Sequence, residues 1–169
     1  MHGNVSFFIA SIMVSPGEWG PNAWELLHGI AERVGSSRHE SVMRDQRNEL
    51  KLTLRHFWAL LPCNKCQTHY REWLLQNPPE QWINTPFPID LQDKLRDWLF
   101  RLHNAVNERN GITIDITLGM VQDKYKSVNL QACFTTLKSI FQRGVQARVL
   151  KPEEWKVASK HLSMLLLTL

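Results

Sequence analysis

Apolar residues recur along this chain at intervals of three and four positions, which is the pattern of one buried face of an α-helix, and strand-like alternation is nearly absent. The pattern therefore predicts an all-α fold, and specifically a helical bundle. The helices that it predicts lie at about residues 22–34, 39–61, 65–76, 90–109, 120–144 and 152–165.

Capping residues and helix breakers set the expected ends of these helices. Asn22, with a glutamate three residues later, predicts a capping box for the first helix, and Asp90 predicts the N-cap of the fourth. Gly35 and Gly144 are expected to end two of the helices. Residues 112–118 alternate only weakly, so we expect a connector there rather than a strand.

Length and composition are those of one ordinary domain. The 169 residues are 43% apolar, so a core can form without a disulfide framework, and three cysteines argue against a disulfide-stapled secreted scaffold. The net charge of +4 is scattered, which argues against nucleic-acid binding. The apolar residues 7–14 fall far short of the roughly 20 that cross a bilayer, so we expect a soluble protein with no membrane anchor. Seven tryptophans suit either a core or the walls around a planar ligand.

Two cysteines separated by two residues, Cys63 and Cys66, stand where one predicted helix stops and the next begins. At a helix N-terminus the free amide hydrogens and the helix dipole stabilise a thiolate, which lowers the pKa of the first cysteine and makes a disulfide easy to reduce. A redox-active pair is therefore physically reasonable. The same spacing also serves zinc ligands and structural disulfides, so the motif alone leaves these open.

Other assignments of the motif fit the surrounding residues less well. A zinc site would use Cys63, Cys66 and His69 with His103 or Cys133, but structural zinc sites usually contain a second closely spaced ligand pair, which the sequence lacks. A c-type haem needs a histidine directly after the second cysteine, where a glutamine stands. Helical periodicity before the pair disfavours a thioredoxin-like domain. A structural disulfide that only braces two helices stays an alternative.

Two further clusters combine aromatic and polar residues. The fourth predicted helix carries His103 and Asn107 on one face, with a tryptophan before them and Arg109 at the exit. Near the first predicted helix, the run Trp19-Gly20-Pro21-Asn22-Ala23-Trp24 is followed by His28 one turn later. Taken alone, the first cluster is explained at least as well by a core histidine and polar residues at a helix end, and the second by a capped helix with an aromatic staple.

In their order along the chain, these clusters resemble the Erv/ALR family of flavin-linked sulfhydryl oxidases. That family joins a W-G-x-x-x-W-x-x-x-H segment, a C-x-x-C pair and an H-N-x-V-N-x-[KR] helix. Small virus-encoded members look most similar, because they too have L-P-C-x-x-C-Q followed by a histidine at the position of His69. The residues that carry the resemblance are Trp19, Gly20, Trp24, His28, Cys63, Cys66, Trp98, His103, Asn104, Val106, Asn107 and Arg109.

The resemblance implies a four-helix bundle plus a short fifth helix that holds FAD non-covalently, with its isoalloxazine ring beside the cysteine pair, and no metal. Residues 1–17 would be an N-terminal segment, 18–126 the FAD-binding sulfhydryl oxidase domain and 127–169 a helical C-terminal extension. Arg109 has an independent reason to bind phosphate, since its fixed fork of donors suits phosphate oxygens. The expected FAD contacts are Trp19, Gly20, Pro21, Trp24, His28, Trp98, His103, Asn104, Val106, Asn107, Arg109 and Lys124.

The resemblance also implies a thiol oxidase that generates protein disulfides. A dithiol client protein, or a thioredoxin-like relay protein, would attack the disulfide at Cys63, and its second thiol would resolve the mixed disulfide. Cys66 would pass two electrons to FAD, and O2 would take them as hydrogen peroxide. We expect a homodimer built on the helical core, and the viral resemblance suggests the host cytoplasm or the virion as the compartment.

Two features of many family members are missing from this sequence. One is a second cysteine pair that staples the helix after the flavin site, since Cys133 has no partner, and the other is a flexible shuttle pair. Electrons are therefore expected to reach Cys63 directly from a partner protein, unless Cys133 acts as a shuttle in a dimer. Among apolar neighbours, Cys133 is more simply an inert core thiol. The alternative function is a non-enzymatic helical binding protein with a structural Cys63–Cys66 disulfide.

Overall fold

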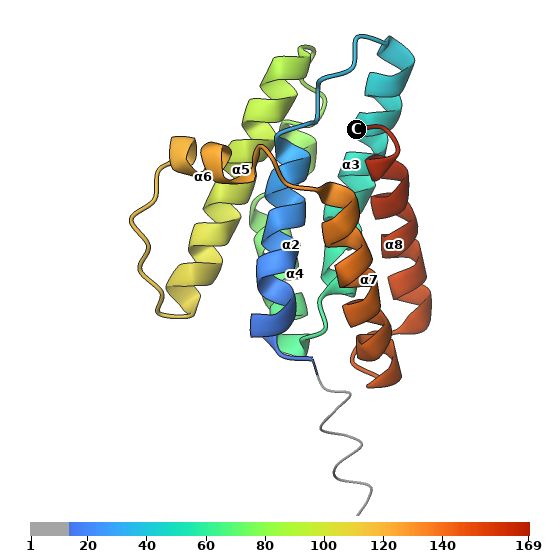
Figure 1. Cartoon of the computed structure of the whole chain (residues 1–169). Coiled ribbons are helices and arrows are strands. Elements are labelled where there is room, and N and C mark those ends of the chain that lie inside the picture. The colour runs from blue at the N-terminus through green and yellow to red at the C-terminus, as the bar shows by residue number, and fades with distance from the viewer. Residues whose placement is uncertain (1–13) are drawn as a thin grey trace, which may run out of the picture.

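The computed structural model describes residues 14–169, and these residues form helices and connecting segments without a strand (Figure 1). The predicted all-α fold is confirmed. The predicted N-terminal segment, residues 1–17, lies mostly outside the described residues. The α-helices are α2 (Pro16–Ala31), α3 (Glu40–His56), α4 (Asn64–Gln76), α5 (Pro88–Arg109), α6 (Leu118–Tyr125), α7 (Leu130–Gln146) and α8 (Pro152–Leu166), and the 3-10 helices are η1 (Phe57–Leu60) and η2 (Pro79–Gln81).

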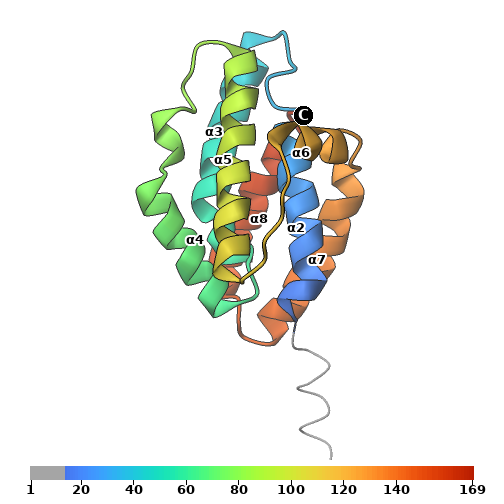
Figure 2. The same ribbon diagram turned by 90° about the vertical axis from the view of Figure 1, so that its left-hand side faces the viewer.

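Helices α2, α3, α4 and α5 run roughly along one direction and form the bundle, and short α6 lies across one end of it against α2 and α5 (Figures 1 and 2). The two C-terminal helices extend the same bundle, since α7 packs along α2 and α8 packs along α3. Residues 127–169 therefore share a core with the helices before them, and the division at residue 126 stays a prediction. Within residues 14–169, every helix is too short or too polar to cross a membrane.

Trp98 lies at the centre of the bundle with 1% of its surface exposed. The rings of Tyr70 and Trp73 meet it edge to face and that of Trp82 is tilted against it, with ring centroids between 6.2 and 6.4 Å away. Its indole N–H donates a hydrogen bond to the backbone carbonyl of Asn77 at 2.8 Å. This aromatic cluster fixes α4 against α5 and leaves the polar group of the buried indole satisfied.

The start of α2 differs from the prediction. The helix begins at Pro16 with Ser15 as its N-cap, so Asn22 lies inside it and the predicted capping box is wrong. Proline is favoured in the first turn of a helix, where its missing N–H is not needed, and Pro21 in the next turn costs the helix one hydrogen bond. The longer helix carries Trp19 into a regular helical position, which matters for the site described below.

The predicted N-cap of the fourth helix is also wrong. α5 begins at Pro88 with Phe87 as its N-cap, and Asp90 lies in its first turn. A carboxylate there still faces the positive end of the helix dipole, and it accepts a hydrogen bond from the hydroxyl of Thr85 at 3.3 Å. The helix ends at Arg109, as its periodicity predicts.

The predicted helix at 120–144 is two helices. Residues 126–129 leave the helix after α6, and the side chain of Asn129 caps α7 by accepting the N–H of Ala132 at 3.0 Å. α7 then continues past Gly144, so that glycine does not end it. The expected connector is confirmed, since residues 112–117 have no regular structure.

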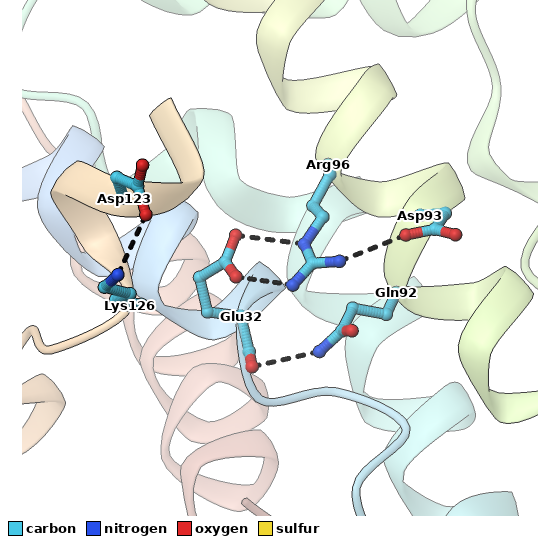
Figure 3. A network of polar contacts seen from close by, with 6 residues as sticks. All are labelled: Glu32, Gln92, Asp93, Arg96, Asp123 and Lys126. Atoms are coloured by element: carbon cyan, nitrogen blue, oxygen red, sulfur yellow. Dashed lines mark hydrogen bonds and ion pairs between the residues drawn. The ribbon is translucent and has the colours of Figure 1, made fainter. Parts of the chain in front are cut away.

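A buried ion pair fixes α5 against the C-terminal end of α2 (Figure 3). Glu32 accepts two hydrogen bonds from the guanidinium of Arg96, at 3.0 and 2.5 Å, and its backbone carbonyl accepts one from Gln92 at 2.9 Å. Only 8% of the Glu32 side chain and 17% of that of Arg96 are exposed. Because two parallel hydrogen bonds fix direction as well as distance, this pair holds two helices that line the cavity described next.

Candidate active site

Cys63 and Cys66 form a disulfide at the N-terminus of α4. Cys63 is the N-cap of that helix, and its sulfur accepts the backbone N–H of Cys66 at 3.2 Å. A sulfur therefore occupies the place where free amide hydrogens and the helix dipole stabilise negative charge. After reduction, the same contact favours the thiolate of Cys63.

A cavity of about 520 Å³ lies beside the disulfide, between α2, α4 and α5. Cys66 is part of its wall, whereas Cys63 is not. The other walls are mostly apolar and aromatic, with a few polar groups, as is usual for cofactor sites of this size. Its principal lining residues are Trp19, Gly20, Ala23, Trp24 and Leu27 from α2, Lys65, Cys66, His69, Tyr70 and Trp73 from α4, and Leu102, Val106 and Arg109 from α5.

Eight of the fourteen predicted site residues fall outside the cavity wall. Those that line it are Trp19, Gly20, Trp24, Cys66, Val106 and Arg109. Trp98 is buried in the core behind it. Pro21 and Asn104 are exposed, Asn107 is half-buried, and the Lys124 ammonium lies 5.0 Å from the ring centroid of Tyr125.

The two predicted histidines form an aromatic cluster with Trp24 and Tyr125. The rings of Trp24 and His103 stack with centroids 3.8 Å apart, and those of His28 and Tyr125 stack at 4.7 Å. Nε2 of His28 lies 3.1 Å from Nδ1 of His103, so one imidazole donates a hydrogen bond to the other. Trp24 belongs both to this cluster and to the cavity wall, so the cluster continues the aromatic surface of the cavity from α2 toward α6.

Both imidazoles of this cluster are neutral at physiological pH. Burial, followed by the charges of His103 and Lys124, lowers the pKa of His28 to about 3. Burial, followed by the charge of Lys124, lowers the pKa of His103 to about 4. Neutral imidazoles can donate and accept hydrogen bonds without placing a charge beside a planar ligand.

Apart from Cys66, the α4 wall of the cavity was missed by sequence reasoning. Tyr70 follows Cys66 by four residues and Trp73 follows Tyr70 by three, so helical periodicity places both on the same face as the cysteine. The Tyr70 hydroxyl donates to the backbone carbonyl of Leu54 at 2.7 Å, and burial raises its pKa, so the phenol stays protonated. Reading the helix onward from its cysteine would have found this wall.

Several polar groups around the cavity lack a protein partner. The indole N–H groups of Trp19 and Trp73 are buried without a hydrogen-bond acceptor. A methyl group added at Gly20 would meet nothing within 4 Å. Arg109 and Lys65 bring positive charge to the wall, and Arg109 is only loosely paired with Glu72, at 3.9 Å. The cavity thus offers flat walls, spare donors and cations beside a disulfide, and residues 14–169 contain no cluster of three potential metal ligands.

Comparisons of the sequence with known proteins find one family model and several FAD-linked sulfhydryl oxidases. The sequence profile of the Erv1 / Alr family matches residues 21–126. The mitochondrial FAD-linked sulfhydryl oxidase ERV1 of Saccharomyces cerevisiae is 27% identical over 53% of this chain and 41% of its own length. The mitochondrial FAD-linked sulfhydryl oxidase of Schizosaccharomyces pombe is 29% identical over 56% of this chain and 46% of its own length.

A viral protein is similar over more of the chain. The FAD-linked sulfhydryl oxidase of African swine fever virus is 24% identical over 71% of this chain and 87% of its own length. By contrast, this chain matches less than half the length of either yeast protein. No solved structure gives a significant match.

Proposed function

The chain belongs to the Erv1 / Alr family, and from that premise we propose that it is an FAD-dependent thiol oxidase that forms disulfides in proteins. The observation that carries the proposal is that the two cysteines of the disulfide lie differently relative to the cavity. Cys66 lines the aromatic cavity and Cys63 does not. A disulfide that only braced two helices would have no reason to border a cavity of about 520 Å³ with aromatic walls.

The residues of the cavity fit FAD. Trp19 and Trp24 offer flat surfaces from α2, and Gly20 between them leaves open space. The unpartnered indole N–H groups of Trp19 and Trp73 suit the acceptor atoms of a flavin. Arg109, with its fork of donors, suits the pyrophosphate.

The remaining predicted contacts extend this proposal beyond the cavity. His28 and His103 would contact the nucleotide part of FAD as neutral donors or acceptors, together with Asn104 and Asn107 on α5. Lys124 would add a second positive charge near the phosphates. These assignments follow from motif position, and the aromatic cluster next to the cavity supports the part that concerns the histidines.

In the proposed reaction, a client thiolate attacks the sulfur of Cys63. A bond forms between the client sulfur and Cys63, and the bond to Cys66 breaks, so that Cys66 becomes a thiolate on the cavity wall. The second client thiol attacks the mixed disulfide, releases Cys63 as a thiolate and leaves as part of an oxidised client. The amide of Cys66 stabilises the released Cys63 sulfur through the hydrogen bond already present.

FAD would supply the two-electron acceptor that restores the Cys63–Cys66 disulfide and the route from there to dioxygen. Overall, two thiols lose two electrons and two protons, and one O2 becomes H2O2. The proposed electron donor is a dithiol client protein or a thioredoxin-like relay, and the proposed assembly is a homodimer.

Purified protein tests the proposal directly. We expect the sample to be yellow, to release FAD on denaturation and to consume oxygen when dithiothreitol is added, with hydrogen peroxide as the product. Light scattering on the same sample measures the oligomer. A colourless protein that does not bind added FAD and takes up no oxygen with dithiothreitol would contradict the proposal.

A further inference from the structure

The loop that carries Cys63 is held from outside by the C-terminal extension, which is residues 127–169 with helices α7 and α8. Residues Leu61 and Pro62 join η1 to α4 with non-helical backbone, so helical hydrogen bonds hold Cys63 only on its α4 side, where its carbonyl accepts the N–H of Gln67 at 2.9 Å. The N–H of Cys63 bonds to the carbonyl of Leu61 at 2.8 Å, which is a bond within the loop itself. Other contacts must therefore set where the loop lies relative to the cavity.

Gln67 supplies one such contact. It lies in the first turn of α4, directly after Cys66, and its side-chain amide donates to the carbonyl of Leu61 at 2.8 Å. The same nitrogen lies 3.5 Å from the carbonyl of Val149, in the turn between α7 and α8. An amide nitrogen carries two hydrogens, so one side chain can bridge the cysteine loop and this turn.

Gly144 near the end of α7 supplies a second contact. A methyl group added there would lie 3.1 Å from Cβ of Pro62 and 3.0 Å from Cδ1 of Leu150. α7 therefore presses against the cysteine loop at a distance that only glycine allows without displacement. α8 packs against η1, the segment that leads into the loop, so the extension supports the loop from both sides.

The turn between α7 and α8 is itself firmly built. The N–H groups of Val149 and Leu150 both bond to the carbonyl of Gly144, at 3.0 and 3.1 Å, and Leu150 is 2% exposed. Arg143 just before the turn pairs with Glu18 in the first turn of α2, which is the opposite wall of the cavity. The turn can therefore act as a fixed support rather than a mobile loop.

We propose that the α7–α8 turn positions the redox disulfide, with Gln67 as the positioning residue that couples the turn to the cysteine loop. The role of this support in catalysis rests on the proposed thiol oxidase function. Its effect on the redox equilibrium of the Cys63–Cys66 pair does not. Holding the loop keeps both sulfurs at bonding distance and so favours the oxidised pair. Losing the support would make the pair easier to reduce.

The test measures the equilibrium of the Cys63–Cys66 pair with a dithiothreitol redox buffer, on the full chain with and without flavin. Trapped thiols are counted by alkylation and mass spectrometry, where Cys133 adds one constant label. For Gln67→Ala and Gln67→Met we expect the equilibrium to shift about three- to tenfold toward the dithiol, and tenfold corresponds to about 30 mV. Gln146→Ala, an exposed glutamine on α7, serves as the matched control and should not shift.

The methionine variant separates the hydrogen bond from packing, because it keeps the length of the side chain and removes the donor. If Gln67→Met behaves like the wild type, or if Gln146→Ala shifts as much, the proposal is overturned. Thermal unfolding of each variant shows that the fold is intact.

A second pair of variants tests the extension side of the contact. Gly144→Ala should shift the same equilibrium in the same direction, whereas Gly119→Ala, whose added methyl would meet only the Thr117 hydroxyl at 3.9 Å, should not. If Gly144→Ala folds but its dithiol–disulfide equilibrium equals that of the wild type, the turn does not position the disulfide. If Gly144→Ala does not fold, the results for Gln67→Ala and Gln67→Met decide the proposal. If the wild type lacks flavin and oxygen uptake but the shifts occur, the proposed function fails and the positioning proposal stands.

Discussion

Helix α2 has two faces that meet very different surroundings. The face of Trp19 and Trp24 borders the cavity, where a methyl group added at Gly20 would meet nothing within 4 Å. The face of Gly29 packs on the extension, where an added methyl would lie 2.7 Å from Leu130 and 3.2 Å from Val128. Both faces are apolar, so hydrophobicity does not distinguish them. The unfilled space beside Gly20 marks the side that borders the cavity.

Polar groups differ between the two sides in the same way. Next to the cavity, His28 and His103 are neutral and bond to each other at 3.1 Å. On the extension side, Nδ1 of His161 in α8 meets a carboxylate oxygen of Glu49 in α3 at 2.9 Å. The second arrangement pairs an imidazole with a carboxylate between α8 and α3, whereas the first pairs two imidazoles and continues the surface of the cavity.

The largest expected effect concerns the two cysteines of the disulfide beside the cavity. Cys66→Ser should lower oxygen consumption with dithiothreitol at least about a thousandfold, because no sulfur on the cavity wall can then deliver electrons. Cys63→Ser should block the reaction with client thiols to a similar extent while the flavin stays bound. Oxygen uptake and the flavin absorption of each purified variant are the measurements.

Cys133→Ser is the control from the extension side. Burial, followed by the hydrogen bond to Glu25, raises the pKa of the Cys133 thiol, which keeps it protonated and unreactive. We expect turnover close to that of the wild type. Turnover retained by Cys66→Ser, or lost in folded Cys133→Ser, would break the assignment of chemistry to one face.

A smaller effect is expected from acid. Unfolded histidines take up a proton with a pKa near 6.5, whereas His28 and His103 in the folded chain do so only near pH 3 and 4. Between pH 6.5 and 4 the unfolded state therefore binds more protons, and stability falls as the pH falls. At pH 5 the loss is about 2 kcal/mol for each histidine that stays neutral.

Urea unfolding of the flavin-free chain at pH 7.5 and pH 5 measures this loss. His28→Met should remove about half of the pH dependence that the pair contributes, whereas His39→Gln, an exposed position before α3, should leave it unchanged. If the free energy of unfolding changed equally between the two pH values in the wild type and in His28→Met, His28 would not stay neutral in the folded chain at pH 5.

The helices were predictable because their apolar periodicity is strong, and their ends were not. Asn22 and Asp90 have the chemistry of caps, but prolines at 16 and 88 start the helices earlier, and a pattern of single residues does not rank the two signals. The motifs named Cys66 and Arg109, which line the cavity, but they also named residues such as Asn104 that lie outside its wall. Periodicity alone places Trp73 on the same face of α4 as Cys66, but that this face lines a cavity follows from how α4 faces α2 and α5, which is tertiary information.

The smallest expected effects come from Gly20 and Gly29, which lie on the two different faces of α2. Gly29→Ala should destabilise the protein by about 1 to 3 kcal/mol, because its methyl would overlap Leu130 and push α7 away. Gly20→Ala should stabilise the flavin-free chain by up to about 1 kcal/mol, because alanine favours the helix and the space beside it is open. Urea unfolding without flavin gives both signs.

The same Gly20→Ala protein should bind FAD more weakly than the wild type, because its methyl takes space that the cofactor needs. Opposite effects on flavin-free stability and on FAD affinity would separate the binding face of α2 from its packing face. A Gly20→Ala protein that is less stable without flavin would mean that this face is packed like the other, and the distinction between the two faces would fail.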